Sequence, residues 1–203
     1  MRREGHLIII SGPSGVGKGT VCTALKAMRP ELKVSISATT RKKRPTEVDG
    51  ENYFFYDENG FYELIQQGEL IEYAKVHGNY YGTPKAYVMD QLDAGEDVIL
   101  EIDVQGAMQV KQNMPGGIYI FLLPPHKNDL EARIRNRGTE DEANIELRLH
   151  NAQEEISMLH DYDYAVINED VDECATLVSH IIDAENQRID ARLMRKYWEE
   201  FHD

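Results

Sequence analysis

Cysteine, long apolar runs and positive charge are all scarce in this chain. Its 203 residues include two cysteines, Cys22 and Cys174, which lie far apart and in no metal-ligand spacing. A disulfide framework is therefore not predicted, and a reducing cytoplasmic location is favoured. The apolar run Leu7–Ile10 has four residues. It is too short for a signal-peptide core or a membrane span, so we expect no membrane partner.

The shortage of positive charge restricts the partners further. There are 22 Lys and Arg residues against 36 Asp and Glu, a formal net charge of −14. Broad electrostatic binding to nucleic acid or to an anionic membrane is therefore not expected. Any anionic substrate must instead be bound by a local group of cations. The length suits one well-buried α/β core with small inserted parts.

A glycine-rich segment follows the first apolar run. Residues 12–20 read Gly-Pro-Ser-Gly-Val-Gly-Lys-Gly-Thr, and helical spacing continues over Thr20–Met28. A strand, a glycine loop with a lysine and a helix N-terminus together predict a nucleoside triphosphate site. A plain Gly-rich turn is the alternative, but such a turn has no need of the lysine. The predicted triphosphate contacts are Gly12, Pro13, Ser14, Gly15, Val16, Gly17, Lys18, Gly19 and Thr20.

The loop departs from its motif at one position. A Ser or Thr that holds magnesium is expected directly after the lysine, but Gly19 stands there and Thr20 comes one residue later. We therefore predict no direct metal ligand from this loop. Phosphate oxygens and water would hold the metal, with Thr20 acting through water.

The pattern of apolar runs predicts an α/β fold. Strand-like runs alternate with helical spacing, which is typical of a parallel sheet covered by helices. Thr83 and Pro84 predict the N-cap and first residue of a helix over 85–94. A second helix is expected over 57–67, before Gly68. The predicted sheet strands are Leu7–Ile10, Val34–Ser37, Asp97–Ile102, Ile118–Leu123 and Tyr164–Ile167.

We expect one domain over residues 5–184 and a helical extension over 185–203. The core comprises about 5–33, 84–125 and 159–184, with a mixed insertion over 34–83 and a two-helix lid over 126–158. In the extension, Ile189, Leu193, Tyr197 and Trp198 lie near one helical face. We expect this face to pack on the core, and a homo-oligomer formed through it is the alternative.

Two groups of cations interrupt the acidic sequence. The first is the run Arg41-Lys42-Lys43-Arg44, for which a solvated charge run or a nuclear-targeting signal is the alternative. The second lies in the polar region after the fourth strand. Transfer of a γ-phosphoryl group needs alignment and cationic stabilisation, and arginine forks match phosphate geometry. These cations favour a kinase. The second group consists of Arg133, Arg137 and Arg148.

Later motifs resemble the guanylate kinases. They are Ser37-Ala38-Thr39-Thr40-Arg41 with Arg44-Pro45 and Glu47, Asp49-Gly50-Glu51-Asn52-Tyr53, Glu72-Tyr73-Ala74, Gly78-Asn79-Tyr80-Tyr81-Gly82-Thr83, Ile102-Asp103-Val104-Gln105-Gly106 and Arg137-Gly138-Thr139. The resemblance runs from about Gly5 to about Asp183. It implies a P-loop three-layer fold and ATP-dependent phosphorylation of GMP, and of dGMP, to the diphosphate with Mg²⁺ as cofactor.

The resemblance also implies roles for individual residues. The acceptor phosphate would be bound by Arg41, Arg44, Tyr53 and Tyr81. Glu72 and Asp103 would accept hydrogen bonds from guanine N1–H and its amine, while Ser37 and Thr83 donate to O6. Adenine lacks that donor pattern. Asn168 would lie near the adenine of ATP. Glu101 occupies a position where the family commonly has Asp, and it would lie near the metal. The catalytic set would be Lys18, Arg41, Arg133, Arg137 and Arg148.

Several alternatives stay open. Tyr53 and Tyr81 fit core aromatics, and Glu72 fits a solvated strand residue. An inactive guanylate-kinase-like module that binds phosphopeptides is a different class of function. A kinase of another monophosphate is a third possibility. The intact loop with Lys18 and the later arginines favour an enzyme with ATP and GMP as its small-molecule substrates.

Overall fold

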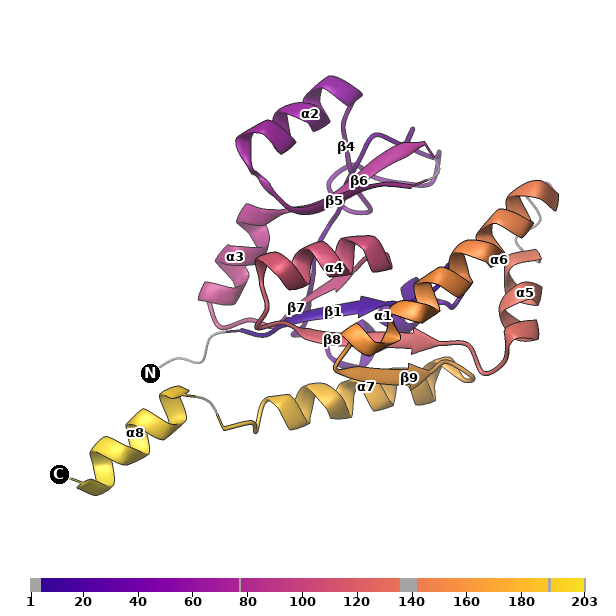
Figure 1. Cartoon of the computed structure of the whole chain (residues 1–203). Coiled ribbons are helices and arrows are strands. Elements are labelled where there is room, and N and C mark those ends of the chain that lie inside the picture. Colours follow the sequence, from indigo (N-terminus) through magenta and orange to yellow (C-terminus); the bar gives the residue numbers. More distant parts are fainter. Residues whose placement is uncertain (1–4, 77, 136–141, 190, 203) are drawn as a thin grey trace.

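A five-stranded parallel sheet forms the centre of the protein in a computed structural model (Figure 1). Residues 1–4, 77, 136–141, 190 and 203 lie outside the part of the chain that the structure describes. The strand order is β2-β7-β1-β8-β9. The predicted parallel sheet is thereby confirmed, although β2 is shorter than expected. The strands are β1 (Leu7–Ser11), β2 (Lys33–Val34), β7 (Val98–Glu101), β8 (Ile118–Leu123) and β9 (Tyr164–Ile167).

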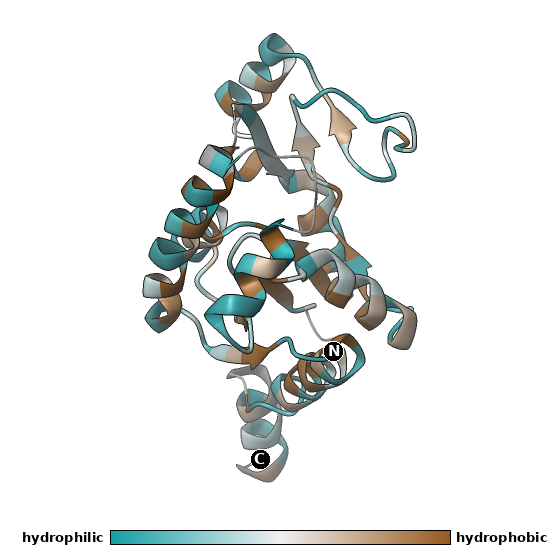
Figure 2. Ribbon diagram, turned by 90° about the vertical axis from the view of Figure 1, so that its right-hand side faces the viewer, coloured by the Kyte–Doolittle hydropathy of each residue, from teal (hydrophilic) through white to brown (hydrophobic). Residues whose placement is uncertain are grey.

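Helices cover both faces of this sheet and give three layers. Strand alternation divides β1 between two apolar clusters. Ile8 and Ile10 pack with α1 and α7, whereas Leu7 and Ile9 pack with α3 and α4. Figure 2 shows the strands of the central sheet as largely hydrophobic. The covering helices are α1 (Lys18–Met28), α3 (Lys85–Asp93), α4 (Val104–Asn113) and α7 (Val171–Glu185).

A second, four-stranded sheet lies beside α4, in the order β4-β3-β6-β5. Helix α2 (Glu58–Gln67) covers it and buries Phe61. The helix begins after Asp57, whose side chain accepts from Gly60 N–H, and ends at Gly68, as predicted. Strand β5 is bonded to α4 through Gln109. The strands are β3 (Ala38–Thr39), β4 (Phe54–Phe55), β5 (Leu70–Val76) and β6 (Asn79–Pro84).

Two further helices follow β8. Helix α5 (Lys127–Arg135) and helix α6 (Glu142–Ser157) share a small apolar cluster, and α6 ends in a 3₁₀ turn, η1 (Met158–Asp161). Two helices were predicted here. The turn predicted at 137–139 lies outside the described residues.

Two local expectations are wrong. Thr83 does not cap α3, because Pro84 occupies the N-cap position and the Thr83 hydroxyl donates to Glu72 instead. The described apolar side chains of helix α8 (Ala191–His202) are exposed and not buried on the core, while the side chain of Leu193 lies outside the described part. Ile189, before the helix, and Phe201 are each 72% exposed. Figure 1 shows α8 directed away from the central sheet.

None of the described helices is both long enough and apolar enough to cross a membrane.

Candidate functional site

The glycine loop joins the end of β1 to the start of α1. Gly12, Gly15 and Gly17 have φ values of +145°, +88° and +98°, which L-residues with side chains rarely adopt. A Cβ on Gly12 would also lie 2.4 Å from the carbonyl oxygen of Leu122. The glycines are therefore needed both for the turn of the loop and for its close approach to β8.

Lys18 lies at the first position of α1 with its head group turned back onto the loop. Its Nζ donates to the Gly12 carbonyl oxygen at 2.6 Å. Burial lowers the pKa of Lys18, while the carboxylates of Glu155 and Glu101 oppose that shift. The buried lysine is thus set among acidic side chains that favour its charged form.

Arg133 and Asn168 hold the loop in place. The Arg133 guanidinium donates to the Val16 carbonyl oxygen at 3.1 Å and to that of Asn168 at 2.9 Å. The Asn168 Nδ2 atom also donates to the Val16 carbonyl oxygen, at 2.7 Å. Asn168 is 2% exposed, so its visible role is to support the loop. The adenine contact of Asn168 stays a prediction.

Helix α6 brings two charged side chains to the same loop. Arg148, 5% exposed, donates from Nη2 to the Ser14 hydroxyl oxygen at 2.6 Å. Glu155 accepts a hydrogen bond from the Ser14 backbone N–H through Oε2 at 3.2 Å. Arg137, the third predicted arginine, lies outside the described residues. The structure therefore places two of the three arginines, Arg133 and Arg148, at the loop.

Glu101 ends β7 directly opposite Gly19. A Cβ on Gly19 would lie 3.3 Å from Glu101 Oε1, so the carboxylate lies beside the position where the motif expects a hydroxyl. Burial raises the pKa of Glu101, and Lys18 opposes the shift. Among the described residues there is no group of three His, Cys, Asp or Glu that could hold a metal. One carboxylate beside a phosphate loop fits Mg²⁺, which binds one or two carboxylates together with phosphates and water. Thr20 is exposed on α1.

Glu72 lies on β5 of the four-stranded sheet and is only 5% exposed, so its carboxylate is buried. The Thr83 hydroxyl donates to its Oε1 at 2.7 Å. Burial raises the pKa of Glu72 to about 7, against an ordinary 4.5, although the Thr83 hydrogen bond opposes the shift. A solvated strand residue is thereby ruled out. A hydroxyl has one hydrogen, so Thr83 cannot donate to Glu72 and to guanine O6 at once.

A second carboxylate, that of Asp103, lies near Glu72 at the start of α4, and Gly106 lies in the first turn of the same helix. Asp103 is the N-cap, and its Oδ1 accepts from the Gly106 N–H at 2.8 Å. A Cβ on Gly106 would lie 2.6 Å from Glu72 Oε2. Gly106 therefore leaves the space in which the Glu72 carboxylate lies next to Asp103.

The predicted phosphate-binding side chains gather around Arg41. Its guanidinium lies 5.2 Å from the centre of the Tyr53 ring, and the Tyr53 and Tyr81 rings are 6.1 Å apart. The Arg41 fork donates to both oxygens of Glu47, at 2.7 and 3.1 Å. Arg41 thereby lowers the pKa of the Glu47 carboxyl to about 2.

The remaining predicted residues lie around this group. Arg44 is exposed and its backbone N–H donates to Glu47 Oε2 at 2.8 Å, while Ser37 is half-buried before β3. Burial raises the pKa of Tyr53, with the Tyr81 and Glu101 charges adding to the shift.

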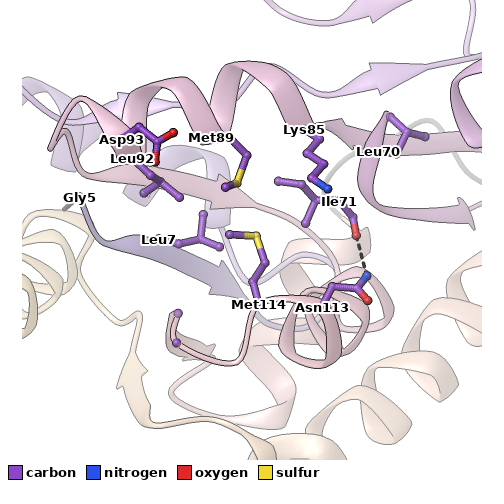
Figure 3. Close-up of a pocket in the computed structure, with 12 residues that line it drawn as sticks. Gly5, Leu7, Leu70, Ile71, Lys85, Met89, Leu92, Asp93, Asn113 and Met114 are labelled. Atoms are coloured by element: carbon purple, nitrogen blue, oxygen red, sulfur yellow. Dashed lines mark hydrogen bonds between the residues drawn. The ribbon is translucent and has the colours of Figure 1, made fainter. Parts of the chain in front are cut away.

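A cavity of about 650 Å³ lies at the amino end of β1, away from the loop at its carboxyl end. Figure 3 shows Leu7, Met89, Leu92 and Met114 pointing into it, with Lys85 at its border. None of the predicted site residues that the structure describes lines this cavity.

Three contacts were missed from the sequence. Glu47 positions Arg41, Gly106 makes room for Glu72, and Glu155 contacts the donor loop. A signal existed for the last, because Arg148 and Glu155 are seven residues apart and so share a helix face. The Arg41–Glu47 contact lies within one loop, six residues apart, and the Gly106–Glu72 contact joins distant segments; no spacing rule predicts either.

Known proteins are similar to this chain in sequence and in fold. Residues 4–185 match the guanylate kinase family. A guanylate kinase of Caldanaerobacter subterraneus subsp. tengcongensis is 50% identical over 190 residues, covering 94% of this chain and 92% of that relative. One from Clostridioides difficile is 50% identical over 187 residues, covering 92% and 91%. The crystal structure of guanylate kinase from Anaplasma phagocytophilum is 33% identical, with a TM-score of 0.81 and coverage of 99% and 97%. The family match over residues 4–185 and these relatives show that the chain belongs to the guanylate kinase family.

Proposed function

We propose that this protein transfers the γ-phosphoryl group of ATP to the phosphate of GMP, and of dGMP, giving ADP and the guanosine diphosphate. The observation that carries the proposal is the pairing of two half-sites. The loop with Lys18 provides the donor half, and the buried Glu72 with the half-buried Asp103 provides the acceptor half. Burial, and to a smaller extent the charges of Tyr81 and Glu101, raise the pKa of Tyr53.

In the donor half, the chain's work is alignment and charge stabilisation. The loop N–H groups and the start of α1 bind phosphate oxygens, and Lys18 reaches the β- and γ-phosphates. Arg133 and Arg148 already lie against the loop. Their guanidinium groups would stabilise charge on the transferring group, together with Arg137. Asn168 would support the loop and face the adenine through its Oδ1, a buried atom without a hydrogen-bond partner among the described residues.

In the acceptor half, phosphate and base are recognised by different groups. Arg41, Arg44, Tyr53 and Tyr81 would bind the GMP phosphate dianion through guanidinium forks and phenol donors.

Ionised Glu72 would accept from guanine N1–H, Asp103 from the exocyclic amine, and Ser37 would donate to O6. Thr83 would join Ser37 only after releasing Glu72. Adenine has no hydrogen on N1, so the buried Glu72 carboxylate would lack the donor that guanine provides, which is costly.

Mg²⁺ is the proposed cofactor, and it would neutralise charge on the β- and γ-phosphate oxygens when bound with ATP. Glu101 is the side chain that would hold it, directly or through water, because Gly19 offers no hydroxyl and leaves the space beside this carboxylate open. Thr20 would take part through water.

The test of this function identifies the products. The full chain is incubated with ATP, Mg²⁺ and GMP, and phosphorus-31 NMR follows the phosphate signals. We expect GDP and ADP to form together, and Lys18→Ala to lower the rate by about 10² or more with every accepted acceptor. The loop assignment is wrong if Lys18→Ala leaves turnover unchanged. An absence of GDP together with tight phosphopeptide binding would indicate the binding-module alternative instead.

We also propose that α8 joins two copies of the chain. Its apolar side chains support this, since Met194 and Phe201 are 63% and 72% exposed. Sedimentation of the full chain is compared with that of a chain ending at residue 188. An oligomer only in the full chain is expected, and a full-chain monomer would contradict the proposal. The cytoplasm is the proposed compartment, supported by the free thiols of Cys22 and Cys174.

A further inference from the structure

The carboxylate of Glu155 is bonded to the phosphate-binding loop itself. Its Oε2 accepts from the Ser14 backbone N–H at 3.2 Å, although the two residues are 141 positions apart. Glu155 lies on α6, two helical turns after Arg148, which donates to the Ser14 hydroxyl from the same face. Helix α6 therefore presents one cation and one anion to the same loop residue.

The surroundings of this carboxylate are those of a bound phosphate. The loop N–H groups form an anion site, and Lys18 adds a full positive charge. Glu155 is the carboxylate that most strongly opposes the lowered pKa of Lys18. Burial in turn raises the pKa of Glu155, while Lys18, the Ser14 N–H and Arg148 each favour its charged form. An anionic oxygen of Glu155 thus accepts a hydrogen bond from the Ser14 N–H, a donor that a phosphate oxygen would otherwise use.

The position along the triphosphate follows from Lys18. In loops of this kind the lysine reaches the β- and γ-phosphates. A carboxylate that interacts with both Lys18 and Arg148 lies at the terminal-phosphate end, where the transferred group would be bound. Two anions cannot share these donors, because each would repel the other across a poorly solvated space.

We propose that Glu155 is a competitor of the ATP γ-phosphate: its carboxylate binds the Ser14 N–H beside Lys18 and Arg148, and ATP must displace it. This inference rests on the proposed donor site. ADP has no terminal phosphate to compete, so Glu155 weakens the binding of ATP more than the binding of ADP. Glu155 acts as a positioning residue that sets the ATP-to-ADP affinity ratio.

The matched control lies one residue earlier on the helix. The Glu154 side chain is 71% exposed and lies 3.6 Å from His150. It has the same charge and the same helix but does not face the loop. Replacing it changes net charge by the same amount and leaves the donor site untouched.

The experiment measures nucleotide affinity by calorimetry on the full chain. Glu155→Gln, Glu155→Ala and Glu154→Gln are compared with the parent protein for AMP-PNP, which has a terminal phosphate that is not transferred, and for ADP. Both Glu155 variants are expected to bind AMP-PNP about tenfold more tightly, with ADP affinity changed less than about twofold. Glu154→Gln is expected to bind both as the parent protein does.

The proposal is overturned if the Glu155 variants bind AMP-PNP no more tightly, or gain equally for AMP-PNP and ADP. Glu155→Asp keeps the negative charge on the same helix. It is the variant to measure if both neutral variants fail to fold. Its AMP-PNP to ADP ratio is expected to stay within about threefold of the parent ratio, and a tenfold rise would overturn the proposal. GMP turnover of the parent protein is measured separately, so a failure of the proposed function is distinguishable from a failure of this inference.

Discussion

The buried carboxylate of Glu72 predicts a pH-dependent affinity for GMP. Burial raises its pKa to about 7, so the group is neutral below pH 7 and ionised above it. Only the ionised form accepts a hydrogen bond from guanine N1–H. As the pH falls from 8 to 6, the ionised fraction drops about tenfold, and KM for GMP is expected to rise about tenfold. The assay is initial-rate ADP formation at saturating ATP over this pH range.

GMP carries a phosphate that titrates near pH 6, so a control must remove that contribution. Glu72→Gln cannot titrate and meets the same GMP phosphate. We expect its KM for GMP to be higher at pH 8 and to depend much less on pH. The reasoning is refuted if the parent protein and Glu72→Gln show the same pH dependence, because the titrating group would then be the phosphate and not Glu72.

The same shift affects stability. In the unfolded chain the pKa of Glu72 is near its ordinary value of 4.5, whereas burial in the folded chain raises this pKa to about 7. The contribution of this group is therefore fully present below pH 4.5 and is lost as the pH rises to 7, a loss of about 3 kcal/mol. In Glu72→Gln the Thr83 hydroxyl donates to a neutral amide oxygen instead of a carboxylate, and this weaker hydrogen bond offsets about 1 kcal/mol of the gain. Denaturant unfolding at pH 8 is expected to find Glu72→Gln more stable by about 2 kcal/mol, and a less stable variant would contradict the burial argument.

Three further substitutions test separate contacts. Gly106→Ala places a methyl group 2.6 Å from Glu72 Oε2 and is expected to raise KM for GMP about tenfold or more, whereas Gly116→Ala, with no heavy atom within 4 Å of its new Cβ, leaves it unchanged. Glu101→Gln is expected to weaken Mn²⁺ binding to the AMP-PNP complex about tenfold, measured by electron paramagnetic resonance, and an unchanged Mn²⁺ affinity would remove Glu101 from the metal site. Gly12→Ala is expected to lower the free energy of unfolding by about 2 kcal/mol or more, measured with denaturant, since its φ is +145° and a carbonyl oxygen lies 2.4 Å from the Cβ; a change below about 0.5 kcal/mol would contradict this.

Local patterns were sufficient for the elements and for the donor loop. Asp57 and Gly68 mark the ends of α2 because a side-chain acceptor and a positive φ act within one turn of the chain. The glycines at 12, 15 and 17 likewise allow the positive φ values that the loop needs. Such signals involve residues that are close in the sequence, so they can be predicted from the sequence alone.

Contacts between distant segments were not predictable in this way. Thr83 precedes Pro84 as an N-cap residue would, but its hydroxyl is bonded to Glu72 on the neighbouring strand. The sequence places Glu155 on the same helix face as Arg148, but it does not predict that this face contacts the loop, which only the fold shows. Helix α8 has an apolar face whose partner the sequence does not identify, and the packing expected on the core is not found.

The most direct test of the account compares kcat/KM for GMP and for AMP, with ATP and Mg²⁺, in the parent protein at pH 8. The account predicts a preference for GMP of about 10⁴ or more, because AMP has no N1–H to donate to the buried Glu72 carboxylate. Comparable kcat/KM values for the two nucleotides would contradict it.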